Sequence, residues 1–181
     1  MNNSKKIIFI IEKITLKVGT TVAWLVLFMT LTAFSVALLR YFFNLGFVWM
    51  QESYIWMHGL IFLLGSSYTL LDDKHVRIDI FYSKFNENYK AYINIFFSFL
   101  FIFPFIFVIS KYSFPYILKS WISLEKSREA GGLHFLYLYK TSIIFFCFLL
   151  FIQTIALILR CILVINKREK KYFSNFKKEK K

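Results

Sequence analysis

The densest cluster of side chains that could take part in chemistry lies in one short segment and consists of Asp72, Asp73, His75, Arg77 and Asp79. Aspartate and histidine are ligand types for divalent metals, so the segment has the composition of a metal site. The cationic side chains of Lys74 and Arg77 stand among these ligand types and would repel a metal ion. We therefore predict a charged turn or a docking surface here, and no metal in this chain.

His58 is the only histidine inside a long apolar stretch, because His75 and His134 lie in more polar segments. A haem bound by two histidines needs both at a similar depth in a helical bundle. A proton relay needs a carboxylate within the membrane to accept the proton. The sequence supplies neither, so we expect His58 to form an interhelical hydrogen bond. Phosphate-binding loops, nucleophile elbows and zinc-protease motifs are absent, which predicts that the chain is not an enzyme.

Two charged residues flank the first connection between apolar stretches. Glu52 lies at the start of the second stretch, where the positive end of a helix stabilises a carboxylate. Contact with a partner subunit is the alternative role of Glu52. Arg40 ends the first stretch on the same side, where it could pair with Glu52 or reach lipid headgroups.

Four apolar stretches are long enough to position these residues within a bilayer. The chain of 181 residues is 58% hydrophobic, and its apolar residues are gathered in blocks. A transmembrane helix needs about 20 mostly apolar residues. Four stretches meet this requirement without a charged residue, namely residues 18–39, 53–71, 91–110 and 141–159. We predict an all-α integral membrane protein with a single membrane domain, residues 1–181, and a basic tail over residues 160–181.

Lysine and arginine are distributed unevenly between the two sides of the predicted bundle. Most of the 23 basic residues lie in the N-terminal segment, the link between the second and third stretches, and the tail. Because basic residues favour the cytoplasmic side, we predict that both termini are cytoplasmic. The net charge of +13 lies in ends and links rather than on one folded face, so nucleic acid is not a predicted partner.

The two longer links mix apolar and charged residues. This pattern predicts amphipathic segments at the membrane surface in residues 72–89 and 111–140. In the second link we expect a surface helix that ends at Gly131 and Gly132. Pro104 lies inside the third stretch and predicts a kink there.

Four short segments carry a resemblance to a known family. Residues 40–44 read RYFFN and residues 49–52 read WMQE. Residues 65–82 read GSSYTLLDDKHVRIDIFY, and residues 131–133 read GGL before the fourth stretch. Together they resemble the small membrane subunit of tripartite ATP-independent periplasmic (TRAP) transporters over nearly the whole chain. The sequence departs from the family pattern at Gln51, because many members have two adjacent acidic residues there.

The resemblance implies one part of a three-part transporter in the bacterial inner membrane. A soluble periplasmic protein would bind an organic acid, and a large multi-helix subunit would hold the substrate and sodium sites. The small subunit would brace the large one and help to dock the binding protein, without a cofactor of its own. The alternative is a membrane anchor of a haem- or quinone-linked redox complex, against which the single intramembrane histidine argues.

Two sets of residues follow from this interpretation. Candidate contacts with the large subunit or lipid are Arg40, Asn44, Glu52, His58, Asp72, Asp73, His75, Arg77 and Asp79. Candidate docking residues for the periplasmic protein, in the link before the fourth stretch, are Lys119, Glu125, Lys126, Arg128 and Glu129. The transported substrate is not predicted, because its recognition would reside in other chains.

Overall fold

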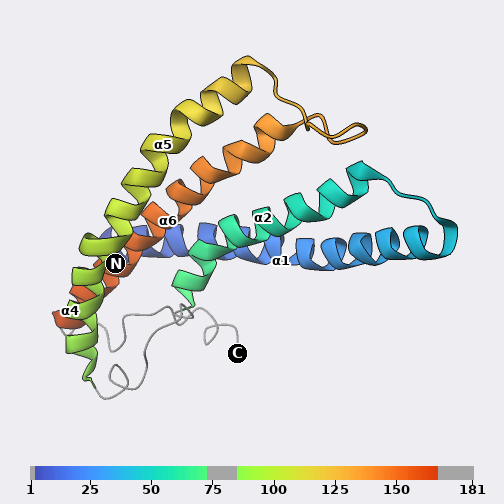
Figure 1. Cartoon of the computed structure of the whole chain (residues 1–181). Helices are drawn as coiled ribbons and strands as arrows, with labels where there is room; N and C mark the ends of the chain where they lie inside the picture. The colour runs from blue at the N-terminus through green and yellow to red at the C-terminus, as the bar shows by residue number, and fades with distance from the viewer. Residues whose placement is uncertain (1–2, 73–84, 167–181) are drawn as a thin grey trace.

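Helices form all of the regular structure in the computed structural model, which describes residues 3–72 and 85–166. Its elements are α1 (Asn3–Phe43), α2 (Val48–Leu71), α4 (Glu87–Phe97), the π-helical segment η1 (Ser98–Ile102), α5 (Phe103–Ile122) and α6 (Leu136–Ile165). The segments α4, η1 and α5 follow one another without a break. Four helices, α1, α2, α4–α5 and α6, are therefore long and apolar enough to cross a membrane, and they alternate in direction (Figure 1). The four predicted spans are confirmed.

The first helix is much longer than the predicted span. With 41 residues, α1 extends about 60 Å, twice the thickness of a hydrocarbon core. Its N-terminal half has a buried stripe at alternating spacings of four and three residues, made up of Ile8, Glu12, Thr15, Gly19 and Val22. This spacing keeps the stripe on one helical face. The segment before residue 18 is therefore a packed part of the helix and not merely a polar leader.

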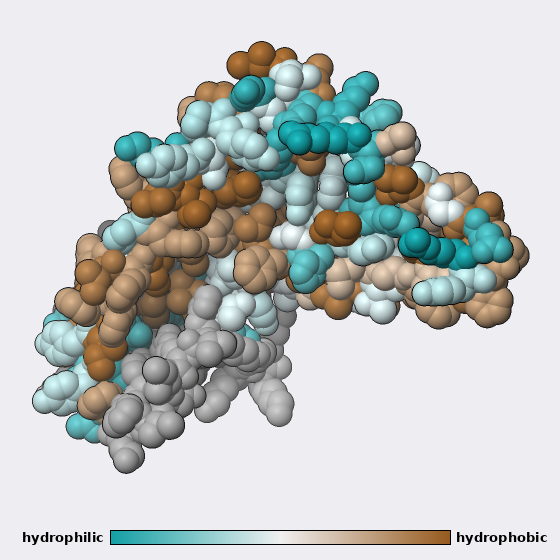
Figure 2. Space-filling model, in the orientation of Figure 1, coloured by the Kyte–Doolittle hydropathy of each residue, from teal (hydrophilic) through white to brown (hydrophobic). Residues whose placement is uncertain are grey.

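Helix α6 lies at the centre of the bundle and contacts α1, α2, α4 and α5. In its most apolar window 44% of the residues are buried within the chain, against 6% for α1. The main apolar core joins residues of α6 to residues of α2, α4 and α5 and consists of Leu70, Ala91, Ile106, Phe146, Cys147, Leu150, Leu157, Cys161 and Val164. The outer helices consequently leave large apolar faces open, as the brown side chains over α4 and α5 show (Figure 2).

The predicted irregularity at Pro104 takes the form of η1, which lies directly before it. A proline within a helix lacks an N–H and its ring clashes with the preceding turn. A π-helical turn widens the helix locally, and such turns are a recognised way of accommodating a bend. The helix changes direction where α4 meets α5 (Figure 1).

The predicted separate surface helix in residues 111–140 is wrong. Residues from Lys111 to Ile122 continue α5 instead. The helix ends in a Schellman motif, in which Leu124 adopts a left-handed backbone (φ 45°) and Glu125 N–H donates to Ser120 C=O at 3.0 Å. The helix thus stops well before Gly131. The amphipathic prediction for residues 72–89 lies largely outside the described residues.

Candidate functional site

The link between α5 and α6 is tied to the start of α2 by Glu52. The Glu52 carboxylate accepts a hydrogen bond from Ser127 Oγ and another from Leu133 N–H, the latter at 2.6 Å. The link also closes on itself, because Ser127 N–H donates to Leu133 C=O at 2.9 Å. One carboxylate therefore holds both ends of the loop from Ser127 to Leu133 against α2.

Two glycines allow this loop to approach Glu52. Gly131 has φ +78°, a left-handed conformation that glycine adopts without strain. A Cβ on Gly132 would lie 2.5 Å from Ser127 Oγ and 2.7 Å from Glu52 Oε2. The glycine pair thus shapes the loop that Glu52 holds, although it does not end a helix as predicted.

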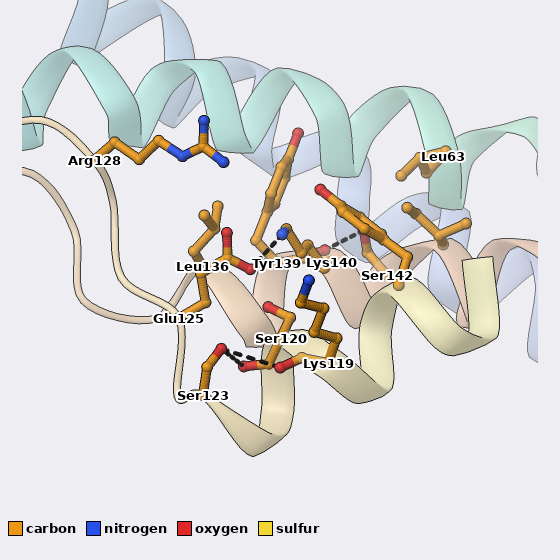
Figure 3. A pocket seen from close by; sticks show the side chains of 12 residues that line it. Leu63, Lys119, Ser120, Ser123, Glu125, Arg128, Leu136, Tyr139, Lys140 and Ser142 are labelled. Atoms are coloured by element: carbon orange, nitrogen blue, oxygen red, sulfur yellow. Dashed lines mark hydrogen bonds and ion pairs between the residues drawn. The ribbon is translucent and has the colours of Figure 1, made fainter. Parts of the chain in front are cut away.

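A pocket of about 660 Å³ lies beside this link, between α2, α5 and α6. Figure 3 shows its polar side chains converging from α5, from the link and from the first turns of α6. Leu63, Leu136 and Ile143 contribute apolar walls. Hydrophilic side chains gather over the same end of the molecule in Figure 2.

An ion pair crosses the pocket. Lys140 Nζ lies 2.5 Å from Glu125 Oε2 and 4.0 Å from the centroid of the Tyr116 ring. The hydrogen bond from Lys140 holds the pKa of Glu125 below its usual value, against a smaller opposing effect of desolvation. Lys119 and Arg128 line the same space, so three cations and one carboxylate share it.

A second polar cluster joins α1 to α6 at the opposite end of the bundle. The Arg160 guanidinium donates two hydrogen bonds to the Glu12 carboxylate, one of them from Nη2 to Oε2 at 2.6 Å. Glu12 is only 1% exposed. Thr15 Oγ1, one turn along α1, donates to Gln153 Oε1 at 2.9 Å. Sequence reasoning missed this cluster, although Glu12 lies on the stripe that a heptad-type spacing would have identified.

Several predicted site residues have local roles. Within the described part of the chain Arg40 makes no ion pair with Glu52, so of the two alternatives for Arg40 the structure does not contain the pairing. Asn44 follows the last residue of α1 and has a left-handed backbone (φ 52°). Glycine is the commonest residue at this position of a helix, and asparagine is also used there. The N–H of Asp72 donates to Tyr68 C=O at 3.0 Å at the end of α2.

His58 does not form the predicted interhelical hydrogen bond with any described residue. Its side chain is exposed and lines an open apolar groove between α1 and α2, together with Met29, Phe34 and Ile55. Gly59, the next residue of α2, lies on the side of the helix that faces α6, where an added Cβ would collide with the Tyr139 hydroxyl.

The remaining predicted contact residues, Asp73, His75, Arg77 and Asp79, lie outside the described residues. In the described ranges no group of three potential ligands could hold a metal ion. Of the predicted docking residues, Lys119, Glu125 and Arg128 line the pocket, whereas Lys126 and Glu129 are exposed and do not line it. The structure therefore divides the predicted docking set into a pocket group and a surface group.

Four apolar spans, three of them packed around the central α6, with a tethered polar link at one end, define a multi-pass helical membrane protein. Residues 28–164 match the family of the tripartite ATP-independent periplasmic transporters, DctQ component. The chain belongs to this family, which is the small membrane subunit that the sequence motifs indicated. No curated protein and no solved structure matches the chain.

Family membership confirms several predictions. The chain is a multi-pass protein of the bacterial inner membrane and a non-enzymatic component of a transporter. The family implies a complex with a large membrane subunit and a periplasmic substrate-binding protein. The alternative of a redox-complex anchor is accordingly replaced by the transporter assignment.

Proposed function

We propose that this chain is the static scaffold of its transporter, bracing the large subunit during sodium-coupled uptake of an organic acid. The observation that carries the proposal is the use of the polar groups within the bundle. Glu12, Thr15, Gln153 and Arg160 bond to one another across α1 and α6. Polar groups satisfied in this way hold helices together and are unavailable to line an ion path.

The open apolar faces of the outer helices support the same role. Phe34 and Ile55 are exposed beside the α1–α2 groove, which also contains the exposed His58. A helix face without charged residues can lie directly against lipid, but a histidine is rare on a lipid-facing surface. We therefore propose that the α1–α2 groove contacts the large subunit. Arg40, Asn44 and the segment from Asp72 to Asp79 remain proposed contacts with the large subunit or lipid.

The link tied by Glu52 is the proposed docking surface for the periplasmic protein. Lys126 and Glu129 are exposed on it, and the Glu52 tether limits how far the loop can move. A loop ordered before binding loses less conformational entropy when a partner docks. The uneven distribution of basic residues supports placing this link in the periplasm and both termini in the cytoplasm, within one membrane domain.

Charge reversal on the link tests the docking proposal. Lys126→Glu combined with Glu129→Lys should weaken binding of the periplasmic protein to the reconstituted membrane complex, because complementary rim charges steer association. Lys13→Glu is the control, because it reverses an exposed charge in the N-terminal part of α1, far along the chain from the link. It should leave this binding unchanged. If the double variant instead causes the two membrane subunits to dissociate, these residues make contacts within the membrane complex and the docking assignment is wrong.

A further inference from the structure

The pocket between α2, α5 and α6 has features that neither the scaffold role nor the docking role uses. Its volume of about 660 Å³ is within the range of sites that bind small molecules, roughly 300–1,000 Å³. It also combines an apolar wall with a strongly polar end (Figure 3). A pocket of this composition suits an amphiphilic ligand.

The polar end carries an excess of positive charge. Lys140 is neutralised by Glu125, at a distance of 2.5 Å. Lys119 and Arg128 line the same pocket, and within the described residues neither makes an ion pair. Two cations at one pocket without their own carboxylates favour an anionic group as the ligand.

A buried hydroxyl supports the same conclusion. Ser120 is 1% exposed and lines the pocket beside Glu125. Its Oγ makes no hydrogen bond of normal geometry among the described residues, although it lies close enough to the Glu125 carboxylate to help lower the pKa of that group. Because a buried hydroxyl without a full hydrogen bond is unfavourable, Ser120 can turn its hydroxyl from Glu125 to a ligand oxygen in the pocket.

The position of the pocket along the helices identifies the source of the anion. Lys119 lies in the last turn of α5, and Lys140 lies near the start of α6. Cations near the ends of spanning helices lie at the level of lipid headgroups. Leu63 and Ile143 continue the pocket farther into the spans, where the surroundings are apolar.

We propose that this pocket binds an anionic phospholipid, whose phosphate contacts Lys119, Arg128 and Ser120. An acyl chain then lies along Leu63 and Ile143. A peptide carboxylate suits the site less well, since its backbone polar groups would be buried beside apolar walls without partners. The lipid site does not depend on the proposed scaffold and docking roles.

Native mass spectrometry of the full-length chain, with any membrane subunit that copurifies, tests the proposal. The probes are phosphatidylglycerol, zwitterionic phosphatidylcholine, and glycerol 3-phosphate as the soluble headgroup analogue. Phosphatidylglycerol should bind most tightly. Lys119→Gln and Arg128→Gln should each weaken its binding about fivefold, the effect of one cation at a membrane surface.

Lys111→Gln is the matched control, because Lys111 lies on the same helix, packs over the Phe107 ring and does not line the pocket. Its phosphatidylglycerol binding should equal that of the unmodified chain. Equal affinity for both lipids, or an equal response of the pocket variants and the control, would overturn the proposal. Glycerol 3-phosphate binding as tightly as phosphatidylglycerol would also overturn it, because the ligand would then be a soluble phosphate.

Discussion

The two ends of the bundle use similar ion pairs in different ways. At one end Glu12 and Arg160 join α1 to α6 through two hydrogen bonds, and the two side chains are 1% and 15% exposed. At the other end Glu125 and Lys140 join the link to α6, and their side chains are 27% and 9% exposed. The first pair is closed against solvent, whereas the second forms the edge of an open pocket.

The difference indicates which end is structural and which end is free to bind. Removing one partner of a buried ion pair leaves an uncompensated charge, so the α1–α6 pair acts as a clamp. In the pocket Lys119 and Arg128 remain without an ion-pair partner in the described part of the chain. We therefore expect substitutions at the clamp to affect stability and substitutions around the pocket to affect binding.

The largest effect should come from Glu12→Ala. Arg160 would lose the buried carboxylate that accepts two of its hydrogen bonds, and we expect a loss of about 3–5 kcal/mol in the free energy of unfolding. Denaturation of the detergent-solubilised chain, followed by circular dichroism, measures this loss. Lys13→Ala, at an exposed neighbour, should change little. A Glu12→Ala chain as stable as the unmodified chain would show that the pair is not a clamp.

Glu52→Ala should loosen the link without separating the helices. The N–H of Leu133 and the hydroxyl of Ser127 would lose their acceptor, at a cost of about 1–3 kcal/mol. Faster amide exchange from Ser127 to Leu133 and faster tryptic cleavage after Arg128 would report the loosening. Gln51→Ala should leave both rates unchanged, and unchanged rates in the Glu52 variant would contradict the tether.

Alanine substitutions at Gly59 and Gly65 test whether α2 approaches α6 closely. A Cβ at position 59 would collide with the Tyr139 hydroxyl, whereas one at position 65 meets nothing within 4 Å. Gly59→Ala should destabilise the chain by about 1–3 kcal/mol through overpacking. Gly65→Ala should be neutral or stabilise α2 by up to about 1 kcal/mol. Equal thermal stability of the two variants would contradict this packing.

The pocket pair should give the smallest effect, and one that depends on pH. Because Lys140 lowers the pKa of Glu125, the pair stabilises the folded chain above the ordinary carboxylate value of 4.5. This contribution is lost as the pH falls through the lowered pKa in the folded chain. Melting temperatures from pH 7 to pH 3.5 should therefore fall more steeply below 4.5 in the unmodified chain than in Glu125→Gln. Equal slopes of melting temperature against pH in the two chains would show that the Glu125–Lys140 pair does not stabilise the folded chain.

Hydropathy predicted the four spans because long uncharged blocks leave few alternatives to spanning helices. The same criterion placed the start of the first helix too late. Glu12 and the neighbouring lysines suggested a polar segment outside the span, although the buried residues before and after residue 18 lie on one helical face. Charge content alone cannot reveal that Glu12 finds Arg160, since the partner lies 148 residues away.

The link was harder to predict than the spans. Leu124 ends α5 in a conformation that usually selects glycine, so the sequence favoured the later glycine pair as the stop. Glu52 was identified as a candidate contact, but its partners are Ser127 and the backbone of Leu133. A backbone donor has no sequence signature, and the loop must be folded before the contact becomes visible.

The scaffold role is tested most directly by purifying the tagged full-length chain from its host in a mild detergent and identifying what accompanies it by mass spectrometry. We expect a large polytopic membrane subunit at close to one copy per chain, because the open apolar faces of the outer helices need a partner in the bilayer. Recovery of the chain alone, or with a haem- or flavin-bearing subunit, would contradict the account.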